Sequence, residues 1–127
     1  MIEITKLILD TAQGIFNAIQ GKKSQRKNEI SSFFLAISRE LDIVVEKLKN
    51  GEVPHGSCAT IQHFATEFPT KLEGVLDKVK AHKYGSALHQ AHNVEMLHIT
   101  VKENPACLAD LEKASGLFRG AGLTVLL

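Results

Sequence analysis

Apolar residues recur at spacings of three and four along almost the whole chain, and this pattern constrains the fold more than any other feature. Because successive residues of a helix turn by about 100°, residues spaced in this way share one stripe of an α-helix. Helical stripes of this kind bury against one another, so we expect an all-α helical bundle. The two clearest stripes are Ile30, Phe33, Phe34, Ile37, Leu41, Val44, Val45 and Leu48, and Cys58, Ile61, Ala65, Phe68, Leu72, Val75 and Val79.

Capping and breaking residues divide the chain into helical segments joined by short loops. Gly21 and Gly51 follow two of the segments, as C-cap glycines do, and Asn104 with Pro105 opens the last one. We predict a single domain, residues 1–127, folded as an antiparallel up-and-down bundle of four to five helices. The expected helices cover residues 4–19, 24–50, 57–79, 86–102 and 105–121, and residues 80–85 form a polar turn.

Pro69 lies inside the third expected helix. Proline in a helix interior removes one backbone hydrogen bond and clashes with the preceding turn. The apolar stripe continues in phase through Pro69, which favours a kink near Ala65 or Thr66 over a break into two collinear pieces. The third helix is therefore predicted to be kinked or broken at Pro69.

Composition is that of an ordinary globular protein with room for one core. Hydrophobic residues make up 44% of the 127 residues and charged residues 23%, so neither disulfides nor a metal is needed for stability. The 15 basic and 14 acidic residues give a net charge of +1, and no nucleic-acid partner is expected. Neither a signal peptide nor a transmembrane run is found, so we expect a cytoplasmic protein whose Cys58 and Cys107 are buried, reduced thiols.

Motifs for known enzyme chemistry are missing from the sequence. There is no glycine-rich phosphate loop, dinucleotide fingerprint, His-Glu-x-x-His, Gly-x-Ser-x-Gly or Cys-x-x-Cys. We therefore expect a non-enzymatic protein without a cofactor, and we assign no catalytic residue.

One alternative function is metal binding on the helix expected over residues 86–102. His89, His92, Glu95 and His98 follow one another at intervals of three, and Glu95 with His98 forms the Glu-x-x-His element of di-metal bundles. Each step of three rotates by about 300°, so the four side chains spread around about half the helix and cannot all face one ion. His92, Glu95 and His98 remain the candidate metal ligands under this alternative.

A second alternative is contact with an anionic surface. Lys22, Lys23, Arg26 and Lys27 form a basic connector directly after a very apolar helix, and they are the candidate contacts to phosphates or anionic lipid. No aromatic residues interleave with them, so a solvated basic loop is the simpler interpretation. Membrane contact is therefore kept only as an alternative.

Two segments carry more apolar surface than a small bundle easily covers. Apolar residues occupy about 220° of the helix over residues 4–19, and the tail over residues 123–127 is apolar to its last residue. Exposed apolar patches mark interfaces, so we predict a protein–protein interaction module or small adaptor that pairs with a protein partner or with itself as a homo-oligomer. The candidate interface residues are Leu9, Phe16, Leu123, Val125 and Leu127.

Residues 37–76 follow a characteristic order: an apolar helix, the sequence Lys-Asn-Gly-Glu-Val-Pro-His-Gly at residues 49–56, then Cys58, then Phe68-Pro69. In this order the chain resembles small uncharacterised bacterial helical-bundle domains, and the resemblance implies a helical fold without implying an activity. An apolar first helix at the head of a bundle is also similar in architecture to the helical executioner domains of cell-death and immune proteins. That likeness implies membrane action, but fold analogy does not establish function.

Overall fold

The computed structural model describes residues 3–127, and this range is all-helical. No β-strand is present among these residues, and one isolated bridge joins Glu73 and Leu76. The all-α prediction is confirmed, whereas the count of four to five helices is not, because the described chain forms seven α-helices and one 3-10 helix. In chain order they are α1 (Ile4–Ala18), α2 (Lys27–Lys49), α3 (His55–Thr66), α4 (Phe68–Lys71), α5 (Lys78–Ala91), α6 (Val94–Glu103), η1 (Pro105–Cys107) and α7 (Leu108–Thr124).

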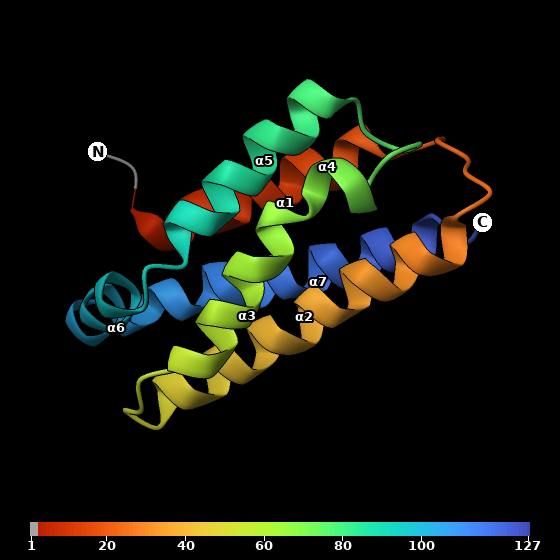
Figure 1. The fold of residues 1–127 in the computed structure, drawn as a ribbon. Helices are drawn as coiled ribbons and strands as arrows, with labels where there is room; N and C mark the ends of the chain where they lie inside the picture. The colour runs from red at the N-terminus through yellow and green to blue at the C-terminus, as the bar shows by residue number, and fades with distance from the viewer. Residues whose placement is uncertain (1–2) are drawn as a thin grey trace.

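Helix α7 packs against both α1 and α2, and α5 packs against α1 and α3. Figure 1 shows α2 and α7 running side by side in opposite directions, while α1 and α7 run in the same direction. The short helices α6 and η1 turn the chain at one end of the bundle. The connector between α1 and α2, the α4–α5 loop and the C-terminus meet at the other end (Figure 1).

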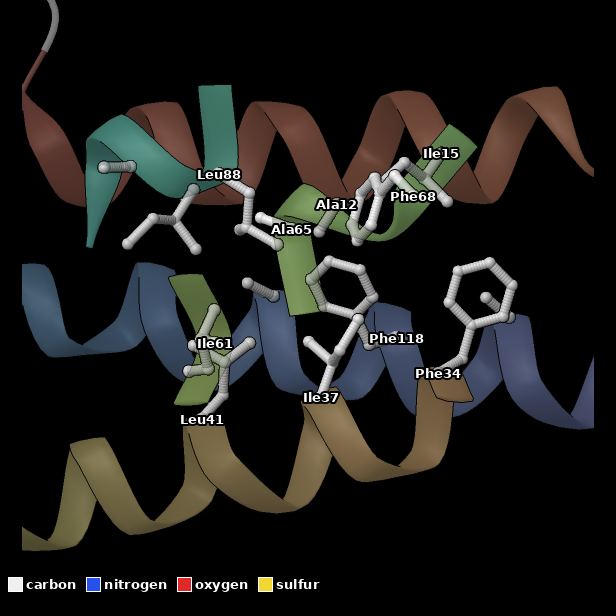
Figure 2. Packing of buried hydrophobic residues seen from close by; sticks show 14 of the residues in the cluster. Ala12, Ile15, Phe34, Ile37, Leu41, Ile61, Ala65, Phe68, Leu88 and Phe118 are labelled. Atoms are coloured by element: carbon white, nitrogen blue, oxygen red, sulfur yellow. The ribbon is translucent and has the colours of Figure 1, made fainter. Parts of the chain in front are cut away.

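The core lies where these helices converge, and aromatic rings fill much of it. Phe34, Phe68 and Phe118 are at most 1% exposed and lie between α1, α2 and α7 (Figure 2). Phe33 packs edge-on against Phe64 and Phe68, with ring centroids 5.6 and 5.7 Å apart. Every member of the two apolar stripes is buried except Val79, so helical spacing predicted the core residues well.

The third helix breaks rather than kinks, and it breaks before Pro69. Helix α3 ends at Thr66, and Glu67 separates it from α4, which begins at Phe68. Pro69 lies in the first turn of α4, where a backbone N–H would have no acceptor within the helix. The N–H that proline lacks therefore costs no helical hydrogen bond there. The expected helix over residues 57–79 is therefore wrong in its second half, and Val79 is 80% exposed because it belongs to a new helix, α5.

The predicted turn over residues 80–85 is also wrong, because these residues are helical. Helix α5 begins after Asp77, whose carboxylate accepts a 2.8 Å hydrogen bond from the backbone N–H of Lys80. The helix expected over residues 86–102 is divided instead by Asn93, whose side chain accepts from the N–H of Met96 at 3.1 Å and caps α6. Two N-caps inside apolar stretches thus account for both errors.

A polar cluster joins α2 to α7, with two buried serines and an exposed ion pair. The hydroxyl of Ser115 donates to the Asp42 carboxylate and lies 3.0 Å from the hydroxyl of Ser38, and Arg119 pairs with Asp42 at 3.1 Å. Because both serines are at most 2% exposed, a lost partner there is not replaced by water.

We expect Ser115→Ala to lower the free energy of unfolding by about 1 kcal/mol, since it leaves the buried hydroxyl of Ser38 without its partner. Urea denaturation followed by circular dichroism measures this change. Ser32→Ala, on the exposed side of α2, is the matched control and should change stability by much less. Equal effects of the two substitutions would contradict a stabilising role for the cluster.

Candidate functional site

The connector of residues 19–26 lies between α1 and α2 and is held to helix α4, while Lys27 of the basic cluster is the first residue of α2. Gly21 adopts a φ of 75°, a left-handed conformation that glycine takes without strain. Arg26 donates from Nε to Glu29 at 3.3 Å and from Nη1 to the carbonyl oxygen of Thr70 at 3.2 Å. Arg26 therefore anchors the connector, whereas Lys22, Lys23 and Lys27 are exposed.

The apolar tail continues the path of α7 beyond Thr124. Backbone bonds from Val125 N to Ala121 O and from Leu127 N to Thr124 O keep its last residues in helical turns. This phase exposes Leu123 (56%), Leu126 (37%) and Leu127 (93%), whereas Val125 is 4% exposed and belongs to the core. Val125 thus offers no surface to a partner, which corrects its place among the candidate interface residues.

The connector and the tail, predicted as separate candidates, lie at the same end of the molecule (Figure 1). One groove of about 390 Å³ is lined by Lys23, Ser24, Gln25, Lys27, Val125 and Leu127. A second, of about 290 Å³, is lined by Ala18, Lys22, Gly74, Val75, Leu76, Asp77 and Lys80. We call this surface the basic end and define it by Lys22, Lys23, Lys27, Lys80, Leu123, Leu126 and Leu127.

Positive charge is in excess at the basic end. Across residues 3–127, none of its four lysines belongs to an ion pair. The second groove holds one carboxylate, that of Asp77, against two ammonium groups, those of Lys22 and Lys80. The surface therefore combines free ammonium groups with exposed leucines.

Helix α1, in contrast, is covered largely by its own chain. Leu9 and Phe16 are only partly exposed. The ring of Phe16 packs against α7, where its Cε2 lies 3.1 Å from the position that a Cβ on Gly120 would take. The wide apolar arc of α1 is explained by its contacts with α5 and α7, and it calls for no second chain.

The structure does not bring the candidate metal ligands together. Glu95 is exposed on α6, and His98 lines a different groove with Lys49 and Lys102. His92 caps the end of α5 and is 1% exposed. Among the described residues, no group of three or more His, Cys, Asp or Glu side chains is placed to hold a metal ion, so the geometry does not support the metal-binding alternative.

His92 is a buried neutral imidazole. Its Nδ1 lies 2.7 Å from the carbonyl oxygen of Leu88, and its Nε2 is buried without a partner. The pKa of His92 is lowered to about 4, mainly by burial and to a lesser degree by the charge of nearby His89, while the hydrogen bond to the Leu88 carbonyl acts in the opposite direction. Near neutral pH the side chain is therefore uncharged and packs in the core.

The two cysteines are free and buried. Burial raises the pKa of the Cys58 thiol to about 12 and also raises that of Cys107. Neither thiol is activated for nucleophilic attack, because reactivity depends on the thiolate form.

A histidine groove between α3 and α5 was missed by sequence reasoning. His82, Ser86 and His89 share one face of α5 and line a groove of about 280 Å³ opposite Thr66 and Pro69. Recognising it required knowing that residues 80–85 are helical. No carboxylate or thiol lines this groove, so its hydroxyl and imidazoles lack the orienting group of a nucleophilic triad.

None of the helices formed by residues 3–127 is long and apolar enough to cross a membrane. A scan against protein-family models and searches of curated proteins and of solved structures found no match to this chain.

Proposed function

We propose that this chain is a non-enzymatic interaction module that binds a protein partner through the basic end. The observation that carries the proposal is the exposure of Leu123, Leu126 and Leu127 at the end of α7, where Leu127 lines a groove. Exposed apolar side chains with a polar rim are typical of protein interfaces. The scaffold we infer for this surface is an up-and-down bundle of five passes, in which α3 and α4 together form one pass and consecutive passes run in opposite directions.

Contact with an anionic membrane is a second candidate function of the same surface, because lysines beside leucines also suit anionic lipid. The shape of the surface favours a protein. A bilayer surface is flat and would meet only the tips of the leucines and lysines, leaving the grooves unfilled. Side chains of a protein partner are able to enter both grooves and exclude water from them.

Leu123→Ser tests the proposal without changing charge. We expect it to weaken partner binding about tenfold, because it removes roughly 1.4 kcal/mol of apolar burial from the interface. The experiment compares affinity capture by the wild type and by the variant from cells that express the protein. Captured proteins are identified by mass spectrometry, and circular dichroism shows that the variant remains folded.

Ile43→Ser is the matched control. Ile43 is similarly exposed, at 43%, and lies 16 residues along α2 from Lys27, about 24 Å at 1.5 Å per residue. A partner retained by Ile43→Ser and lost by Leu123→Ser supports the basic end as its binding surface. Equal capture by both variants would rule that surface out. Sedimentation of the purified protein shows whether the partner is a second copy.

A further inference from the structure

The basic end carries more charge than apolar contact alone requires. Lys22, Lys23, Lys27 and Lys80 are exposed, and no ion pair involves them within residues 3–127. We infer that the partner contributes a carboxylate-rich segment that lies across the connector and places acidic side chains in both grooves. This inference rests on the proposed function and names the chemistry of its partner.

The connector is fixed between the two grooves, so that both open beside it. Gly74 approaches so closely that a Cβ there would lie 3.0 Å from the Ser24 hydroxyl, and Arg26 bonds to the carbonyl of Thr70. These contacts hold one side of the connector against the α4–α5 segment. Lys22 lines the groove on that side, and Lys23 lines the groove beside the tail.

The positive charge of the basic end is a local concentration, since the whole chain has a net charge of only +1. Glu29 pairs with Arg26, and the Asp77 carboxylate, which keeps its negative charge while it caps the backbone N–H of Lys80, offsets only part of the charge of the four lysines. Complementary charges at exposed positions act mainly on specificity and on the rate of association, and salt screens them. Binding of the acidic segment should therefore weaken as salt is added.

The groove linings favour a peptide segment over a lipid headgroup. The groove beside the tail offers the side chains of Ser24 and Gln25 for hydrogen bonds as well as the apolar surface of Val125 and Leu127. A segment that alternates acidic and apolar residues matches this mixture of ammonium, amide and aliphatic groups. A layer of lipid headgroups supplies the charge without side chains that fill the groove.

The test is a titration of the labelled full chain with two peptides, followed by NMR of its backbone amides. One peptide alternates glutamate with leucine, and the other alternates glutamine with leucine. We expect the glutamate peptide to shift the amides of residues 22–27, 74–80 and 123–127. The glutamine peptide should bind at least about tenfold more weakly.

Charge-neutral variants test the assignment on the protein side. Replacing Lys23 and Lys27 with glutamine should weaken binding of the glutamate peptide about tenfold and flatten its salt dependence. The matched control replaces Lys6 and Lys102, two exposed lysines outside the basic end, and should leave binding unchanged. Circular dichroism establishes that both double variants are folded.

Three results would overturn the inference: no amide shifts from the glutamate peptide up to about 1 mM, equal binding of the two peptides, or tighter binding to phosphatidylserine vesicles than to the glutamate peptide. Failure of the proposed function itself has a different signature. In that case Leu123→Ser would bind the glutamate peptide as tightly as the wild type does, since the leucines would take no part.

Discussion

Gly85→Ala should lower the free energy of unfolding by about 3 kcal/mol, which corresponds to a fall of roughly 10 °C in Tm for a chain of this length. Helices α3 and α5 approach each other closely at this glycine. A Cβ on Gly85 would lie 2.5 Å from the backbone carbonyl oxygen of Ala65 and 3.3 Å from the Cβ of Phe68. Neither neighbour is a flexible side-chain end, so the two helices must separate and loosen the core around Phe68.

Thermal and urea denaturation of the wild type and Gly85→Ala measure this effect. Gly116→Ala is the control, because Gly116 is exposed on α7 and a Cβ there would meet nothing within 4 Å. That substitution should raise stability by up to about 1 kcal/mol, since alanine has the higher helix propensity. A Gly85→Ala protein as stable as the wild type would show that α3 and α5 do not cross in this way.

The contrast between these glycines shows where sequence reasoning reached its limit. Helical spacing identified the buried residues, because burial of one helix face follows from the local pattern alone. Gly85 looked like the end of a turn, and its role appears only when α3, about 20 residues earlier, lies against it. Asp77 and Asn93 could have been read as N-caps, yet the apolar stripes continued past both and favoured longer helices.

The basic end was predictable in its parts but not as a whole. Lys22, Lys23 and Lys27 stood out as a basic cluster, and Leu123 and Leu127 as part of an apolar tail. About 100 residues separate the two sets, so only the path of α7 brings them together. Reading the tail as an extension of that helix would also have placed Val125 on the buried side, because it lies four residues after buried Ala121.

The largest expected pH effect comes from His92. An unfolded histidine titrates near its ordinary pKa of 6.5, whereas burial lowers the pKa of folded His92 to about 4. Between these values the unfolded chain binds a proton that the folded chain does not. The contribution of His92 to the free energy of unfolding is therefore complete above pH 6.5, falls as the pH drops from 6.5 to 4, and stays constant below pH 4. The difference of two and a half units between the unfolded and folded pKa values corresponds to about 3 kcal/mol of stability.

The structural cause is the buried Nε2 of His92, which has no hydrogen-bond partner for a second proton. The measurement is the free energy of unfolding in urea at pH 7 and pH 4.5 for the wild type, His92→Leu and the exposed control His89→Gln. Carboxylates titrate alike in all three, so the comparison isolates the histidine. We expect the wild type and His89→Gln to lose roughly 2 kcal/mol more than His92→Leu over this interval, whatever the stability of that variant at pH 7. Equal losses in all three proteins, or an NMR-measured pKa near 6.5 for folded His92, would place that imidazole in contact with solvent and contradict its position at the end of α5.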